Sequence, residues 1–145
     1  MVDRFKLITD VHVFLKNDKD QILMLRRANT GYEDGNYSVI AGHLDGHEEV
    51  IEAAIREAKE EAGIEIRFID IKVVGIMHRK ENDERISFFL SATRWFGEIV
   101  NMEPERCDDF SWFPICDLPV NTIPYVRRAI EQWGNGLFFD SYGWR

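Results

Sequence analysis

The sequence has few cysteines, and their placement fits neither a disulfide framework nor a structural zinc site. Cys107 and Cys116 are the only two, nine residues apart, and no histidine stands at zinc-site spacing from them. A secreted domain held together by disulfides and a zinc-binding module are therefore excluded. We expect both thiols to be free and reduced.

Long apolar runs are also missing. No stretch approaches the roughly 20 apolar residues that are needed to cross a bilayer. The N-terminal segment MVDRFKLITDVHVFLKND, residues 1–18, mixes charged and apolar residues from its start and so lacks the apolar core of a secretory signal. These features predict a cytoplasmic protein with no membrane partner.

The sequence contains no basic block. It carries 26 acidic and 18 basic side chains, which gives a formal net charge of −8 and opposes nonspecific attraction to nucleic acid or anionic lipid. We therefore expect no nucleic-acid partner. A phosphate-bearing partner would have to be bound locally, by a few arginines or by a metal ion, because an acidic site can hold an anionic substrate only if a cation stands between them.

No internal repeat, low-complexity tract or Pro/Gly/Ser-rich linker divides the chain. At 145 residues it has the size of one ordinary domain and can bury roughly 70% of its unfolded surface. We therefore predict a single domain over residues 1–145.

Apolar patterning predicts strands before, between and after two helices. The predicted strands cover residues 5–15, 21–27, 36–42, 65–80, 85–96 and 109–114, and the predicted helices cover residues 48–62 and 123–133. The polar residues 81–84 join two of these strands into a long hairpin. This order predicts the α/β (α+β) class, a three-layer α/β/α sandwich with a mixed sheet rather than a repeating parallel unit.

The helix at 48–62 carries an acidic cluster. Glu57, Glu60 and Glu61 fall within a sector about 100° wide, beside an apolar stripe, although like charges at this spacing repel by a few tenths of a kcal/mol per pair. Arg56 lies four residues before Glu60 and can pin it by a charged hydrogen bond. A solvated helix face is the alternative interpretation.

The loop before this helix favours a site over a solvated face. AGHLDGHE, residues 41–48, contains Gly42 and Gly46 and can fold back over the helix start. It would bring Glu48 and a backbone carbonyl toward the three glutamates. Four carboxylates and a carbonyl oxygen suit a hard dication such as Mg²⁺.

Residues 42–64, GHLDGHEEVIEAAIREAKEEAGI, resemble the 23-residue signature of the Nudix hydrolase family. The signature is a glycine, five residues, a glutamate, seven residues, Arg-Glu, an apolar position, any residue, Glu-Glu, any residue, a glycine and an apolar residue. The matching residues are Gly42, Glu48, Arg56, Glu57, Ala58, Lys59, Glu60, Glu61, Ala62, Gly63 and Ile64. Two departures are minor: Ala58 is smaller than the usual aliphatic residue, and Ala41 precedes Gly42 where many relatives have a second glycine.

The resemblance implies an α/β/α sandwich over essentially the whole chain and Mg²⁺- or Mn²⁺-dependent hydrolysis of a diphosphate linked to another group, typically a nucleoside. It makes Glu57, Glu60 and Glu61 metal ligands, with the carbonyl oxygen of Ala41. It also implies that Glu48 supports the metal directly or through water and that Arg56 orients a ligand carboxylate.

The catalytic base varies within this family, and two alternatives stay open here. One is Glu57 itself. The other is an acidic residue of the segment NMEPERCDDFSW, residues 101–112, where Glu103, Glu105, Asp108 and Asp109 compete and Asp109 is preferred.

Substrate contacts are predicted from the second strand and the turn that follows it. Arg26 and Arg27 end that strand, where similar proteins use an arginine to contact the substrate phosphate. Because side chains alternate along a strand, only one of the two arginines would face the site. The alternative is that both belong to a solvated strand end. Tyr32 and Tyr37 flank a turn and could stack on a base or pack. His43 and His47 are expected to be solvent-facing loop residues rather than ligands.

The sequence thus predicts a pyrophosphohydrolase that acts on a small-molecule nucleotide, a nucleoside triphosphate or a sugar nucleotide. The alternative is a Nudix-type module that binds a nucleotide without turnover, and the intact set of Arg56 and three glutamates argues against it. Action on capped RNA is disfavoured by the acidic balance. Whether the aromatic tail at 136–145 closes a pocket or makes a homodimer contact stays open.

Overall fold

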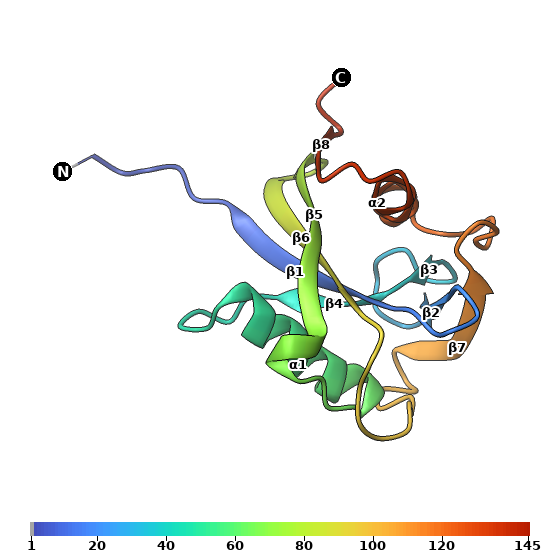
Figure 1. The fold of residues 1–145 in the computed structure, drawn as a ribbon. Helices are drawn as coiled ribbons and strands as arrows, with labels where there is room; N and C mark the ends of the chain where they lie inside the picture. The colour runs from blue at the N-terminus through green and yellow to red at the C-terminus, as the bar shows by residue number, and fades with distance from the viewer. Residues whose placement is uncertain (1) are drawn as a thin grey trace.

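The computed structural model describes residues 2–145, which fold into two β-sheets between α1 (Val50–Ala62) and α2 (Pro124–Gly134) (Figure 1). The larger sheet has the order β4-β1-β6-β5-β8. Its strands are β1 (Ile8–Leu15), β4 (Ile40–His43), β5 (Ile71–Lys80), β6 (Glu84–Ala92) and β8 (Phe139–Tyr142). Because β1 pairs in parallel with β6 and β5 with β8 while the other pairs are antiparallel, the sheet is mixed, as predicted.

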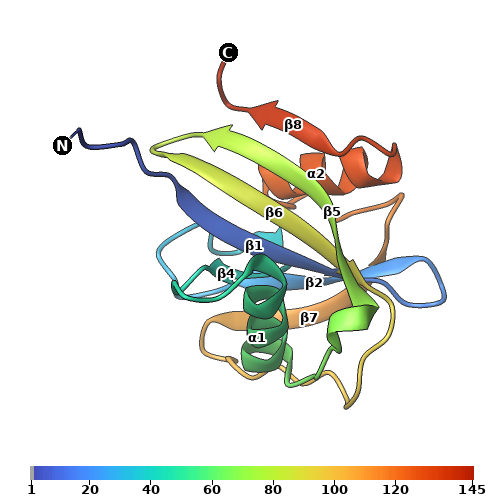
Figure 2. The ribbon, with the colours of Figure 1, turned by 60° about the vertical axis from the view of Figure 1, so that its left-hand side comes forward.

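The smaller sheet is antiparallel and has the order β3-β2-β7. Its strands are β2 (Gln21–Arg27), β3 (Tyr37–Ser38) and β7 (Cys107–Pro114). In Figure 2, β2 and β7 run side by side across the end of β1. The short 3-10 helix η1 (Phe68–Asp70) precedes β5.

The two helices cover separate apolar cores because β1 alternates its side chains between two faces. Val11 and Val13 face α1, whereas Phe14 faces α2. The α1 helix contributes mainly alanines to its core, Ala53, Ala54, Ala58 and Ala62, which lets it lie close to the sheet. The layered arrangement confirms the predicted fold class. Among the helices of residues 2–145, none is both long and apolar enough to cross a membrane.

Four predicted strands are divided in the structure or differ from it by three or more residues at one end. One is the strand predicted at 85–96, which ends at Ala92. The strand predicted at 36–42 is divided at Val39: Tyr37 and Ser38 pair with β2, and residues 40–43 pair with β1 in the other sheet. The strand predicted at 65–80 begins at Ile71, because residues 68–70 form η1. The first strand begins at Ile8 rather than at residue 5. The hairpin of β5 and β6 is confirmed.

The aromatic tail folds back onto the body of the protein. Its residues 139–142 form β8, which adds to the edge of β5. Beyond β8, the indole Nε1 of Trp144 donates to the carbonyl oxygen of His78 at 3.0 Å. The tail therefore lies against β5.

Candidate active site

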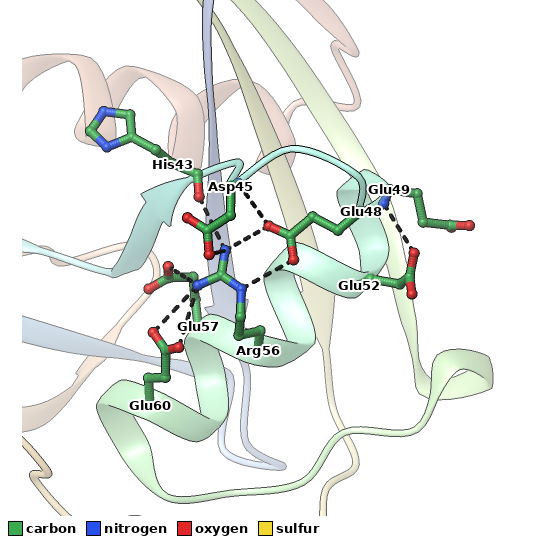
Figure 3. Close-up of polar contacts among 8 residues, drawn as sticks. All are labelled: His43, Asp45, Glu48, Glu49, Glu52, Arg56, Glu57 and Glu60. Carbon is green, nitrogen blue, oxygen red and sulfur yellow. Dashed lines mark hydrogen bonds and ion pairs between the residues drawn. The ribbon is translucent and has the colours of Figure 1, made fainter.

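Arg56 of α1 is the centre of a polar network that joins the helix to the preceding loop (Figure 3). Its Nη2 and Nε donate to the two carboxylate oxygens of Glu48, at 2.7 and 3.1 Å. Its Nη1 donates to Glu57 at 2.8 Å and lies 3.4 Å from Glu60. Nη2 also donates to the carbonyl oxygen of His43 at 3.1 Å. A guanidinium with this many acceptors is fixed in place and fixes them in turn.

The ends of α1 are set by local sequence, which fixes the direction in which its glutamates point. Glu49 is the N-cap and forms a capping box with Glu52, whose side chain accepts the backbone N–H of Glu49 at 3.0 Å. Gly63 ends the helix in the left-handed conformation, with φ of 70°, which glycine adopts without strain. These caps hold the turn from residue 57 to residue 61 against β4.

Glu57 is buried beneath the backbone of β4. The residue of β4 that faces the Glu57 side chain must be a glycine, because a Cβ on Gly42 would lie 2.2 Å from the Glu57 carboxylate carbon. The residue is 8% exposed. The first glycine of the motif therefore has a definite structural purpose, which is to make room for this carboxylate.

Glu61 brings a second carboxylate to the same place. Burial, a hydrogen bond with Glu57 and the charges of Glu57 and Glu103 raise the pKa of Glu61 well above its ordinary value, and only the backbone N–H of Ala41 acts in the opposite direction. Two carboxylates in contact, one of them buried and the other partly buried, need either a shared proton or a cation between them. Their oxygen donors fit a hard divalent ion such as Mg²⁺.

The structure brings together only part of the predicted ligand set. Glu57, Glu61 and the backbone of Ala41 meet, whereas Glu48 and Glu60 are held by Arg56. Within residues 2–145, no three His, Cys, Asp or Glu side chains are arranged as a metal site. Glu48 is therefore placed as a partner of Arg56 at the edge of the carboxylate pair.

A cavity of about 250 Å³ opens beside Glu61. Glu103 from the loop before β7 lines it, and so do Arg27 and Arg106. Arg26 lines it as well, so the cavity combines two carboxylates with three arginines. This combination suits a phosphate chain bound through a cation on one side and through guanidinium groups on the other.

Asp109 lies apart from this cavity. Its carboxylate accepts hydrogen bonds from the hydroxyl of Tyr37 and from Ser111 Oγ, and it stands opposite Arg26 in the β2–β7 register. Tyr37 belongs to the core under α2, and Phe110, the next residue along β7, packs toward α1. Asp109 therefore points away from the glutamates of α1.

The two arginines predicted to contact substrate are held differently. The Nε of Arg26 donates to Asp108 at 2.7 Å. Arg27 donates to the carbonyl oxygen of Tyr32 at 2.7 Å and to the hydroxyl of Thr30 at 3.0 Å. Both arginines line the cavity beside Glu61, and Arg27 also lines a second cavity next to it.

A group of buried polar residues lies on the α2 face of the larger sheet and was not predicted from the sequence. Asp10, His12 and Arg79 are all at least 95% buried there. The available signal was the occurrence of Asp10 and His12 two residues apart inside an apolar strand, since buried polar side chains are uncommon. His43 lies at the edge of this group, with Nε2 3.4 Å from Arg85.

Comparison with known proteins shows matches in sequence and structure. The family model described as NUDIX domain matches residues 6–133. The NAD-capped RNA hydrolase NudC of Pseudomonas entomophila is 34% identical over 100 residues, which are 69% of this chain and 34% of that protein. The chain thus spans about a third of the length of this relative.

Two further matches cover more of both chains. The putative 8-oxo-dGTP diphosphatase of Bacillus subtilis is 28% identical over 124 residues, which cover 86% of this chain and 78% of that protein. The crystal structure of the MutT NUDIX hydrolase from Burkholderia pseudomallei superposes with a TM-score of 0.79 at 24% identity, over 88% of this chain and 98% of that one. At this identity the structural match concerns the fold.

Proposed function

Because the chain belongs to the Nudix hydrolase family, we propose that it is a divalent-metal-dependent pyrophosphohydrolase. It cleaves the diphosphate linkage of a nucleoside diphosphate derivative, a nucleoside triphosphate or a sugar nucleotide, by attack of water at phosphorus. The observation that carries the proposal is the contact between the carboxylate of Glu57, buried beneath Gly42, and that of the partly buried Glu61. Such a pair has no structural benefit unless a cation offsets its charge.

The residues around the cavity support this chemistry. A bound Mg²⁺ or Mn²⁺ supplies charge neutralisation of the diphosphate and activation of the attacking water. Glu57 and Glu61 would hold it, with Glu60 and the Ala41 carbonyl completing the set and Glu48 supporting it. Arg56 would position Glu48 and Glu57, to which it donates hydrogen bonds. The lining of the cavity by Arg27 and Arg106 supports a role for them in binding phosphate oxygens.

Glu103 fits the role of catalytic base better than the other acidic residues of segment 101–112. It lines the same cavity as Glu61, whereas the carboxylate of Asp109 is occupied by Tyr37 and Ser111. Glu57 remains the alternative within α1. A general base must come within hydrogen-bonding reach of the attacking water, and Asp109 points away from the site.

We also propose that the protein acts in the cytoplasm on a small-molecule nucleotide rather than on nucleic acid. The net charge of −8 supports this choice. The name of the Pseudomonas entomophila relative concerns NAD-capped RNA, so a capped RNA belongs in the substrate screen. Elution volume in gel filtration tests whether the protein forms a homodimer.

The test is a screen for hydrolysis in the presence of Mg²⁺ or Mn²⁺. The substrates are the nucleoside triphosphates, sugar nucleotides, dinucleoside polyphosphates and an NAD-capped RNA, and the products are phosphate or mononucleotide. Glu60→Gln and Glu61→Gln should each lower turnover by at least about a hundredfold, since each removes a charged ligand. Glu65→Gln, which affects an exposed glutamate paired with Lys59, should not.

Two results would contradict the proposal. If the wild-type protein hydrolyses none of these compounds but binds one, it is a nucleotide-binding module. If both glutamine variants turn over substrate normally at saturating Mg²⁺, the two glutamates do not take part in catalysis.

A further inference from the structure

The segment before β7 is attached to the C-terminal end of α1 (Figure 2). The backbone N–H of Met102 donates to the carbonyl oxygen of Glu61 at 3.1 Å, and that of Val100 donates to the carbonyl oxygen of Ala62 at 3.0 Å. The last carbonyl groups of a helix have no partner within the helix, and here the segment supplies two donors. The stretch of chain that leads to Glu103 is thereby joined to the helix that carries Glu61.

Asn101 joins the same segment to the first residue of β7. Its Oδ1 accepts the backbone N–H of Glu103 at 3.0 Å, and its Nδ2 donates to the carbonyl oxygen of Cys107 at 2.7 Å. A side-chain amide carries both an acceptor and a donor. One side chain therefore fixes the backbone of Glu103 relative to the start of the strand.

A turn holds the other side of the Glu103 backbone. The carbonyl oxygen of Glu103 accepts from the backbone N–H groups of Arg106 at 2.9 Å and Cys107 at 3.0 Å. Pro104 follows, and a proline at this position of a turn has a fixed φ and restricts the residue before it. The N–H of Glu103 is thus held by Asn101 and its carbonyl oxygen by the turn.

The carboxylate of Glu103 depends on this backbone for its position. Within residues 2–145, the hydrogen bonds of Glu103 all involve its backbone. The residue is half-buried and lines the cavity beside Glu61. Asp109 differs, because Tyr37 and Ser111 bond its carboxylate directly. Since no side-chain bond directs the carboxylate of Glu103, the place where its backbone is held decides what the carboxylate can reach.

We propose that Asn101 is a positioning residue, which holds Glu103 so that its carboxylate reaches the attacking water. The role of Asn101 rests on the proposed function, in which Glu103 is the catalytic base. Glu103 accepts a proton of the water while the water oxygen bonds to phosphorus and the bridging oxygen leaves with the electron pair of its bond. A base must lie within hydrogen-bonding reach of that proton, and Asn101 acts on the reaction through Glu103.

Amide hydrogen exchange, read by NMR on metal-free protein, tests the contact without turnover. In Asn101→Ala the amide of Glu103 should exchange at least about tenfold faster than in wild type, because it loses its acceptor. Asn17→Ala is the matched control. The Oδ1 of Asn17 also accepts the backbone N–H two residues on, that of Lys19 at 3.0 Å, in the turn between β1 and β2. It should speed exchange at Lys19 and leave Glu103 unchanged.

Kinetics with a hydrolysed substrate test whether Asn101 acts through Glu103. Asn101→Ala should lower kcat by about tenfold or more with little change in KM, since a misplaced base weakens the chemical step rather than substrate binding. Glu103→Gln should lower kcat further. Adding Asn101→Ala to Glu103→Gln should then have no additional effect, whereas a merely structural defect would lower kcat in both backgrounds. Asn17→Ala should turn over like wild type.

A conservative variant keeps the test usable. Asn101→Ser retains a neutral oxygen that can accept the N–H two residues on but loses the donor to Cys107. It should recover part of the kcat and of the Glu103 amide protection that alanine loses. If Asn101→Ala does not fold, Asn101→Ser replaces it in the comparison with Glu103→Gln.

Four results would overturn the proposal. The Glu103 amide exchanges in Asn101→Ala as it does in wild type; the variant raises KM and leaves kcat unchanged, in which case Asn101 contacts the substrate; it lowers kcat equally with and without Glu103; or Glu103→Gln turns over normally, in which case the hydrolase function stands with another base. If the wild-type protein hydrolyses nothing, the proposed function fails, and amide exchange still decides whether Asn101 holds Glu103.

Discussion

At the scale of single residues, the candidate active site depends on close approach between a helix side chain and a strand backbone. Glu57 can lie where it does only because Gly42 has no side chain, and Arg56 then bonds the carboxylate from the other side. The requirement for glycine at this position is thus a requirement for space, since φ of Gly42 is not in the left-handed region. Any larger residue must displace the carboxylate.

Replacing Gly42 by alanine should therefore disable the site without unfolding the protein. The added Cβ would come within 2.2 Å of the Glu57 carboxylate, so the side chain must turn away from Glu61. We expect turnover to fall by about a hundredfold, in line with the loss of a metal-bound carboxylate, while circular dichroism stays native. Gly134→Ala is the control, because nothing lies within 4 Å of its added Cβ. Equal turnover in the two variants would show that the position of Glu57 is not important.

At the scale of elements, α2 is joined to the larger sheet by a buried polar contact. His12 of β1 and the hydroxyl of Tyr125 of α2 are hydrogen-bonded at 2.8 Å, and His12 is 1% exposed. Burial lowers the pKa of His12 from 6.5 to about 4, with Asp10 acting in the opposite direction and Arg79 and Arg85 adding to the decrease. The ring is therefore neutral in the folded protein at neutral pH.

This lowered pKa predicts a specific loss of stability in mild acid. Between pH 6.5 and 4 the unfolded chain protonates His12 and the folded chain does not, so the free energy of unfolding falls as the pH falls through that window. The expected loss is on the order of 3 kcal/mol by pH 4, at 1.36 kcal/mol per pKa unit. Urea denaturation at several pH values measures it.

The comparison with His12→Gln isolates the contribution of His12 from those of carboxylates that titrate nearby. Glutamine keeps a polar group near Tyr125 but does not titrate. The wild-type protein should lose its advantage over the variant as the pH decreases from 7 to 4.5. Stability curves that run parallel over this range would mean that His12 titrates normally in the fold.

Elements whose signals are local could be predicted from the sequence. The α1 helix was predicted at 48–62 and spans Val50–Ala62. Its two ends carry local signals, the capping box at the start and Gly63 at the end. The division of segment 36–42 at Val39 could not be predicted, since both halves are apolar and their partners lie elsewhere in the chain. The same holds for Asp10, whose arginine partners are 69 and 75 residues away.

The candidate site could also be predicted only where its residues are close in the sequence. The structure brings the motif residues together around Arg56 because they occupy one helix and the loop before it. Asp109 was preferred as the base from sequence, yet strand alternation in β7 turns it toward Tyr37, and Glu103 lines the cavity instead. A residue in a long acidic loop cannot be assigned to a face until the register of the following strand is known.

At the scale of the whole molecule, binding of a cation at the carboxylate pair should stabilise the fold. A ligand that binds only the folded state adds RT ln(1 + [L]/Kd), about 2.7 kcal/mol at a hundred times the dissociation constant. We therefore expect millimolar MgCl₂ or MnCl₂ to raise the melting temperature by several degrees. The comparison must use NaCl of matched ionic strength, because salt alone screens repulsion among the acidic residues.

The double variant Glu60→Gln/Glu61→Gln is the control for this measurement. It should melt slightly higher than wild type in the absence of metal, because like charges are removed, and it should respond to MgCl₂ no more than to NaCl. A wild-type protein that also responds equally to the two salts would show that the acidic face of α1 is merely solvated.

Arg56 and its partners are close together in the sequence, which affects the order in which contacts form during folding. Its farthest hydrogen-bond partner, the carbonyl oxygen of His43, is only 13 residues away, so closing this network costs little chain entropy. The contacts of Asp10 with Arg79 and Arg85 close loops of 69 and 75 residues, which form more slowly. During folding, the network of Arg56 can thus form before the buried contacts of Asp10 with Arg79 and Arg85 close the larger sheet.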